Sequence, residues 1–130
     1  MRYMLLMTGT AGALRAVEAL SAAELRARRA FLRDLERELV DHGELIQGED
    51  LAAPEHAVVC TWRRGAPSTA RPPFPTDREF LARYWIVDCD TGERAREIAA
   101  RVALAPGPSG APMGWPVEVR PVMGTPGEEM

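Results

Sequence analysis

The segment Arg2-Tyr-Met-Leu-Leu-Met-Thr8 is apolar at nearly every position between its two ends. In an extended strand successive side chains point to opposite faces, so this segment presents apolar side chains on both faces. A strand of this kind must be covered on both sides. The segment therefore predicts a sheet that has helices on one face and a second layer on the other.

Two capping boxes predict the helices. In Ser21-Ala-Ala-Glu24 the hydroxyl and the carboxylate are spaced to satisfy free amides at a helix start, and we predict a helix over 22–42 that Gly43 ends. Asp90-Thr-Gly-Glu93 is a similar box and predicts a helix over 91–105. The first helix has an apolar stripe formed by Leu25, Phe31, Leu32, Leu35 and Leu39. We expect solvent to cover its charged face, which consists of Arg26, Arg28, Arg29, Arg33, Asp34, Arg37 and Glu38.

The remaining segments predict strands and short connections. Strands are expected at 44–48, 57–62, 80–88 and 115–123, with a helical turn or two within 14–20, a hairpin turn at 63–66 and an edge strand within the proline-rich stretch 67–75. This order is the split βαβ, or ferredoxin-like, arrangement with an extra hairpin, an α+β fold in which two helices lie on one face of an antiparallel sheet. We expect one domain over 1–124, a C-terminal tail at 125–130, and a homodimer that buries the uncovered sheet faces.

Composition excludes several classes of protein. The chain has 130 residues, of which 46% are hydrophobic and 27% charged, as is typical of one soluble globular domain. All 16 basic residues are arginine, so lysine chemistry such as Schiff-base formation is excluded. A net charge of −3 argues against nucleic acid as a partner. No apolar run is long enough for a signal peptide or a membrane span, so we expect a cytoplasmic protein without a membrane partner.

The two cysteines, Cys60 and Cys89, are 29 positions apart and match no metal or redox motif. We expect both to be free, buried thiols. The compact cluster Asp41-His42-Gly43-Glu44 also lacks a recognised ligand spacing. No metal and no cofactor is therefore expected.

Several short motifs, in order along the chain, resemble the YCII-related family in its DGPF-type branch. They are Arg2-Tyr-Met-Leu-Leu-Met7, Gly43-Glu-Leu45, Gly48-Glu-Asp-Leu51, Pro73-Phe74 with Arg78-Glu79, and Val117-Glu-Val-Arg-Pro-Val122. The resemblance implies a dimeric α+β barrel with a small pocket between sheet and loops. It also implies that cofactor-free relatives act on small cyclic or aromatic substrates by elimination, isomerisation or dehydrochlorination.

The chain departs from the family pattern at four places. Arg71-Pro-Pro-Phe74 stands where the signature reads Asp-Gly-Pro-Phe, and Thr76 stands where an acidic residue is usual. Ala82 and Arg83 stand where the family has paired glycines. The helix-borne histidine of a His/Asp pair has no counterpart between Ser21 and Asp41. These departures count against any mechanism that relies on those groups.

The candidate catalytic residues are His56 and Glu49. Histidine is suited to proton transfer near neutral pH, and His56 lies at the mouth of a predicted strand; a surface or capping role is its alternative. Glu49 and Glu79 match acidic positions of the family, with solvated or arginine-paired carboxylates as the alternative. Arg71 is the candidate anchor for an anionic ligand group, or else a surface residue.

Aromatic residues are the remaining ligand-binding candidates. Trp62, Phe74, Tyr84 and Trp85 are expected to line a pocket, with core or interface packing as the alternative. Two functions stay open on this evidence. One is a cofactor-free lyase or isomerase that acts on a small cyclic or aromatic metabolite, and the other is a non-catalytic small-molecule-binding or accessory dimer.

Overall fold

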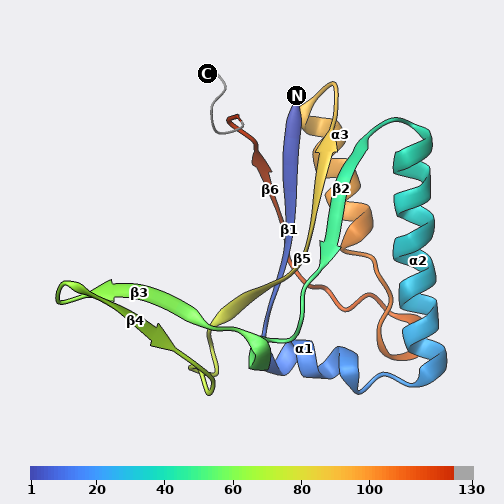
Figure 1. Cartoon of the computed structure of the whole chain (residues 1–130). Helices are drawn as coiled ribbons and strands as arrows, with labels where there is room; N and C mark the ends of the chain where they lie inside the picture. The colour runs from blue at the N-terminus through green and yellow to red at the C-terminus, as the bar shows by residue number, and fades with distance from the viewer. Residues whose placement is uncertain (125–130) are drawn as a thin grey trace.

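The computed structural model describes residues 1–124 and contains two sheets and three α-helices (Figure 1). The strands are β1 (Arg2–Thr10), β2 (Leu45–Asp50), β3 (Val59–Arg63), β4 (Ala66–Ala70), β5 (Glu79–Asp88) and β6 (Val117–Pro121). The α-helices are α1 (Ala11–Glu18), α2 (Ala22–Asp41) and α3 (Gly92–Val102), and two short 3₁₀ turns are η1 (Pro54–His56) and η2 (Pro108–Gly110). The tail predicted at 125–130 lies outside the described residues.

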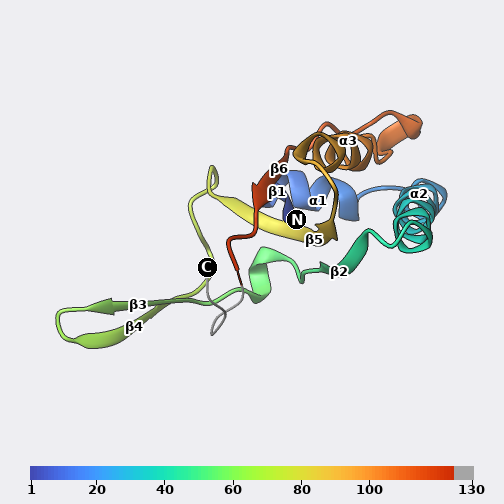
Figure 2. The same ribbon diagram turned by 90° about the horizontal axis from the view of Figure 1, so that it is seen from above.

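The main sheet has the strand order β2-β5-β1-β6, and every neighbouring pair is antiparallel. Helices α2 and α3 lie on the same face of this sheet, as the view from above makes clear (Figure 2). The topology confirms the predicted ferredoxin-like α+β fold. None of the helices in the described part of the chain is long and apolar enough to cross a membrane.

The capping box predicted for α2 is confirmed. The Ser21 hydroxyl accepts a hydrogen bond from the Glu24 amide at 3.1 Å, and the Glu24 carboxylate accepts one from the Ser21 amide at 2.9 Å. Gly43, with φ of 69°, turns the chain out of the helix in the left-handed conformation that favours glycine. Helix α2 is therefore defined at both ends by local sequence.

The start of α3 differs from its prediction by one residue. Thr91, not Asp90, is the N-cap, and its hydroxyl accepts a hydrogen bond from the Arg94 amide at 3.2 Å. Both residues are good caps, so the sequence alone does not decide between them. Helix α1 also begins earlier than expected, because Thr10 caps it directly at the end of β1.

The core lies between the helix-covered face of the sheet and helices α2 and α3. Leu5 on β1 pairs with Trp85 on β5, and both are essentially buried. Gly48 on β2 lies beside Trp85, and a Cβ at that position would come within 2.9 Å of the indole. The indole therefore requires glycine there. The residues that close the core are Leu32, Leu35 and Leu39 of α2 and Ile98, Ala99 and Val102 of α3.

The opposite face of the sheet, which we call the open face, has no helix over it (Figure 2). Strand pairing places Leu6 beside Tyr84 and Met4 beside Ile86 on this face, and all four side chains are only half-buried. The second layer that β1 predicts is thus not supplied by the described part of this chain.

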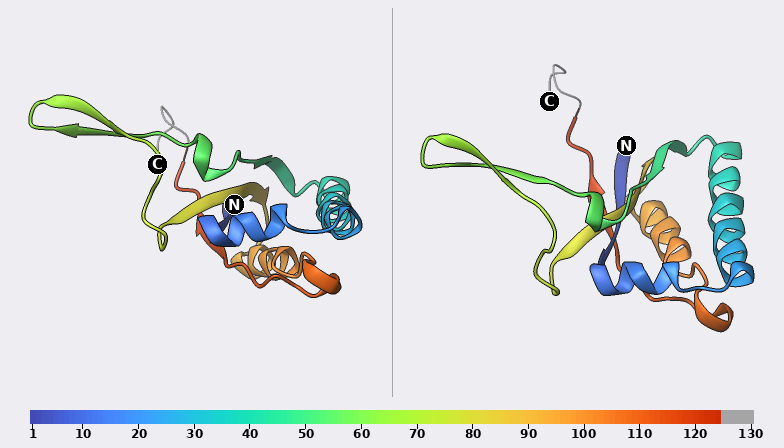
Figure 3. Two further views of the ribbon diagram at one scale, coloured as in Figure 1. Left: turned by 90° about the horizontal axis from the view of Figure 1, so that it is seen from below. Right: turned by 60° about the horizontal axis from the view of Figure 1, so that its bottom comes forward.

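Strands β3 and β4 form a separate hairpin that extends away from the body of the protein (Figures 1 and 3). Arg64 and Gly65 both have positive φ, as a two-residue hairpin turn requires, which confirms the turn predicted at 63–66. Cys60 lies on this hairpin and is exposed, whereas Cys89 is buried. The expectation of two buried thiols was therefore wrong for Cys60, because its strand does not enter the main sheet.

Candidate functional site

A cavity of about 210 Å³ opens at the end of the helix-covered face where α1 lies, between α1, α2 and the ends of the central strands. Much of its wall is apolar, formed by Leu14, Val17, Leu25, Leu32 and Trp115. Three arginines also line it, Arg28 and Arg29 from α2 and Arg83 from β5, together with the carboxylates of Glu18 and Asp50. The cavity thus combines an apolar body with more positive than negative charges.

Arg28 is the buried charge of this cavity, with only 6% of the residue exposed. Its guanidinium donates hydrogen bonds to the backbone oxygens of Ala105 at 3.3 Å and Pro106 at 3.4 Å, and it lies 5.3 Å from the centre of the Trp115 ring. Within residues 1–124 the ion pairs do not include Arg28. Its charge is therefore held by dipoles and an aromatic face rather than by a carboxylate.

The surroundings of Arg28 disfavour its charge. Burial lowers the pKa of the guanidinium, and the positive charge of Arg83 lowers it further, while the carboxylate of Asp50 raises it. An anion in the cavity would remove this penalty. Uncompensated positive charge at a partly apolar wall is a typical feature of sites that bind organic anions.

Arg83 faces the same cavity from β5 but is partly compensated. Its guanidinium forms an ion pair with Glu36 of α2, and its Nη1 lies 4.0 Å from a carboxylate oxygen of Asp50. Its Nε is buried and has no hydrogen-bond partner in the described structure. Arg83 therefore has one donor left over beyond its structural ion pair.

The residues that the sequence nominated for catalysis and anion binding lie elsewhere. His56 is in η1 with 69% of its side chain exposed, 3.7 Å from the Glu55 carboxylate. Glu49 is exposed on β2, and Arg71 and Glu79 are exposed at the two ends of the segment between β4 and β5. None of these four residues lines the cavity that holds Arg28 and Arg83.

The nominated aromatic residues occupy three different environments. Phe74 lines a second cavity of about 390 Å³ together with Phe80, and the Arg78 guanidinium lies 4.7 Å from the centre of each ring. Tyr84 is on the open face, where its hydroxyl accepts a hydrogen bond from Gln47 at 2.8 Å. Trp85 is in the core and donates a hydrogen bond to Glu36 at 3.1 Å. Of these three residues, Phe74 alone lines one of the two cavities. The fourth aromatic candidate, Trp62, is exposed on β3.

Sequence reasoning missed Arg28 because it assigned the whole charged face of the helix to solvent, and that assignment was wrong for this residue. The spacing of Arg28 from the leucines of the same helix does indicate its burial. Arg28 follows Leu25 by three positions and precedes Leu32 by four, so it falls on the same stripe as Leu35 and Leu39. An arginine in register with a buried stripe indicates a buried charge.

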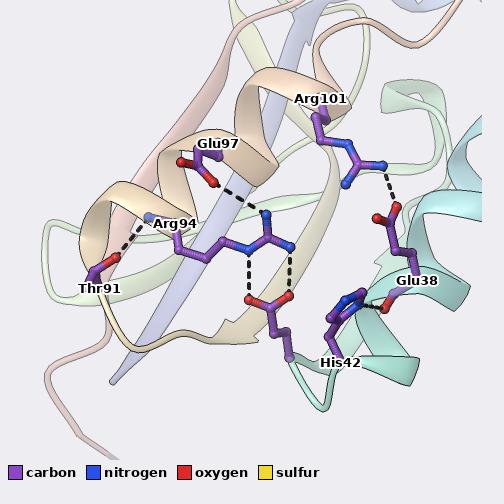
Figure 4. A network of polar contacts seen from close by, with 7 residues as sticks. Glu38, His42, Thr91, Arg94, Glu97 and Arg101 are labelled. Carbon is purple, nitrogen blue, oxygen red and sulfur yellow. Dashed lines mark hydrogen bonds and ion pairs between the residues drawn. The ribbon is translucent and has the colours of Figure 1, made fainter.

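A second arginine cluster lies between the C-terminal part of α2 and helix α3 (Figure 4). Arg94 of α3 donates two hydrogen bonds of 2.9 Å to the carboxylate of Glu44, and it also pairs with Glu97 at 3.4 Å. Arg101 pairs with Glu38 of α2. The ring of His42 lies 2.7 Å from the Glu38 backbone oxygen, at the end of α2. Every arginine in this cluster has a carboxylate partner, so the cluster is structural.

Comparison with known proteins agrees with this fold. No curated protein sequence matches the chain. The family described as the YCII-related domain matches residues 1–107, which is well over half of the chain and includes β1 through α3. Arg28, Asp50 and Arg83 lie inside the match, and Trp115 lies beyond it. The chain therefore belongs to the YCII-related domain family.

Proposed function

We propose that this protein binds a small organic anion, a carboxylate with an apolar body, in the cavity between α1, α2 and the sheet. The observation that carries the proposal is the burial of Arg28 in the cavity wall without a carboxylate partner among residues 1–124. A buried charge that lacks an ionic partner is costly, and such groups are concentrated at binding sites.

The chemistry of the wall defines the ligand class. A guanidinium donates in a fixed fork that matches the two oxygens of a carboxylate. The leucines, Val17 and Trp115 offer an apolar surface to the rest of the ligand. A volume of about 210 Å³ admits a molecule the size of a single substituted ring.

Isothermal titration calorimetry with benzoate tests this proposal, and benzyl alcohol serves as the neutral ligand of similar shape. We expect benzoate to bind and benzyl alcohol to bind at least roughly ten times more weakly, since a charge-assisted hydrogen bond contributes about 1.5–3 kcal/mol. Equal affinities for the two ligands, or no heat with benzoate and a panel of larger aryl carboxylates, would refute it.

A second candidate function is cofactor-free lyase or isomerase activity at the same cavity. Asp50 lines the cavity, and its carboxylate lies near Arg83, so it could accept a proton from a carbon next to the bound anion. Asp50→Asn should then abolish turnover of any organic anion that the wild-type protein converts, while benzoate still binds. If His56 or Glu49 moves the proton instead, His56→Ala or Glu49→Gln should lower turnover and Asp50→Asn should not.

We also propose that the protein is a homodimer joined through the open face, so that two sheets enclose a barrel. The support is the half-buried patch formed by the two cross-strand pairs Met4–Ile86 and Leu6–Tyr84, which no element of the described chain covers. Sedimentation equilibrium at micromolar concentration should give about twice the 14.3 kDa mass of one chain. A mass of one chain at 100 micromolar would rule out this assembly.

A further inference from the structure

The β3–β4 hairpin with its flanking residues, 57–71, is here called the arm. No residue from 59 to 70 is buried, and only Val59 and Ser68 are half-buried. An isolated two-stranded hairpin is marginal in water, because it has no third strand or helix to cover a face. The arm therefore lacks, within the described chain, the contact that would stabilise it.

One side of the arm is mostly apolar. Strand pairing sets Trp62 opposite Pro67 and Cys60 opposite Thr69, so these four side chains share a face. Trp62 is 70% exposed, and Val58, just before β3, is 44% exposed. An exposed tryptophan on an otherwise unsupported hairpin is typical of a residue that another molecule covers.

The direction of the arm indicates which surface that molecule occupies. The arm leaves the body beside β2 and β5 and extends on the side of the open face, away from α2 and α3 (Figures 2 and 3). A molecule seated on the open face would thus lie next to the arm.

Charge indicates what the molecule is. The arm carries Arg63, Arg64 and Arg71 and no acidic residue, whereas the whole chain has a net charge of −3. On the open face Glu49 of β2 and Glu118 of β6 flank the pair Tyr84 and Leu6 in one row across the sheet, while Arg120 of β6 lies beside Met4 in another row. The arm is therefore complementary in charge to the row of this same chain that contains Glu49 and Glu118.

We propose that the arm clasps a second copy of this chain seated on the open face, and that Trp62 is buried against that copy. In a two-fold dimer each arm would clasp the other copy, so the contact forms twice. This inference rests on the dimer proposed above. It adds a second contact surface, the arm, to the contact between the two open faces.

Sedimentation velocity over a dilution series tests the clasp with Trp62→Ala and a matched control, Thr61→Ala, which changes an exposed neighbour on the other face of the arm. We expect Trp62→Ala to weaken dimerisation by roughly 30-fold or more, and Thr61→Ala to change it by less than about threefold. The tryptophan emission of the wild type, after subtraction of the emission of Trp62→Ala, should shift to longer wavelength on dilution, and acrylamide should quench it more strongly.

A charge-reversal variant gives an independent readout if Trp62→Ala folds poorly. Arg63→Glu with Arg64→Glu should weaken the dimer most at low salt, where the repulsion is least screened. A wild-type dimer that neither set of substitutions weakens overturns the clasp and leaves the sheet-face dimer standing. A wild-type monomer at 100 micromolar overturns both.

Discussion

Arg28 and Arg94 occupy opposite ends of the same helix layer and are compensated in opposite ways. Arg94 forms a two-pronged pair with Glu44 and a further pair with Glu97. Arg28 has backbone oxygens, the Met7 sulfur and the Trp115 ring around it, and it is the more deeply buried of the two. Arg94 thus has carboxylate partners, whereas Arg28 has none among residues 1–124.

The two arginines therefore have different expected roles, Arg94 in stability and Arg28 in ligand binding. At Arg94 the paired carboxylate raises the pKa of the guanidinium, and the guanidinium lowers the pKa of Glu44, so both charges favour the folded state. At Arg28 burial lowers the pKa of the guanidinium, so its charge opposes folding. The Arg94 end should therefore respond to mutation in stability, and the Arg28 end in ligand binding.

The largest expected effect is loss of ligand binding in Arg28→Met. Methionine keeps the apolar stem but removes the donors, so affinity for benzoate should fall by roughly 100-fold or more. The free energy of unfolding without ligand should rise, or fall by less than about 1 kcal/mol, because a buried unpaired charge is also removed. Calorimetry and urea titration measure the two quantities.

Arg26→Met is the matched control for that variant, since Arg26 is exposed on the same helix. It should leave benzoate affinity unchanged within about twofold. If Arg28→Met bound benzoate as well as wild type, or if Arg26→Met lost binding equally, the contrast between the two arginines would be broken.

The next effect in size is loss of stability in Arg94→Met. Glu44 is only 15% exposed at its side chain and would lose both hydrogen bonds. We expect the free energy of unfolding to fall by about 1–2 kcal/mol in urea titration, with benzoate affinity unchanged. An unchanged free energy of unfolding would show that the Arg94–Glu44 ion pair makes no net contribution to stability.

A smaller effect should appear in the pH dependence of stability. The folded-state pKa of Glu44 lies below its ordinary value of 4.5, mainly because Arg94 donates hydrogen bonds to it. Its stabilisation is therefore complete above pH 4.5 and is lost as the pH falls through the lowered pKa. The difference in unfolding free energy between wild type and Glu44→Gln, followed from pH 7 to pH 2.5, should shrink toward the acid end. A difference that grows on acidification would give the opposite sign and contradict the account.

The smallest effect is expected at the exposed pair of Arg101 and Glu38, where 41% of each side chain is accessible. Solvent and salt screen such a pair, so Arg101→Gln should leave the urea midpoint unchanged within error. A clear loss of stability would mean that this cluster acts as one network with Arg94.

Local sequence was enough for most of the fold. Ser21 and Glu24 define the start of α2, and the Arg64-Gly65 turn defines the hairpin, because caps and turns depend on neighbours along the chain. No local signal shows where the hairpin points, since that depends on contacts beyond the hairpin itself. The sequence therefore predicts that the hairpin forms, but it does not predict that the hairpin extends away from the body of the protein.

The candidate site was less accessible to sequence reasoning. Arg83 alternates with Trp85 and Val87 along β5, so its direction into the helix-covered face was readable. Its meeting with Arg28 was not, because a strand and a helix 55 positions apart come together only through the tertiary fold. His56 and Glu49 were nominated for their chemistry, and chemistry does not determine which side chains converge on a cavity.

NMR of the arginine side chains during a benzoate titration tests the central claim most directly. The Nε–H signal of Arg28, identified by its absence in Arg28→Met, should shift and saturate with the affinity that calorimetry measures, and the indole N–H signal of Trp115 should move with it. Benzyl alcohol should move the indole signal alone. An Arg28 signal that stays fixed while exposed arginines such as Arg26 shift without saturating would contradict the assignment of this cavity as an anion site.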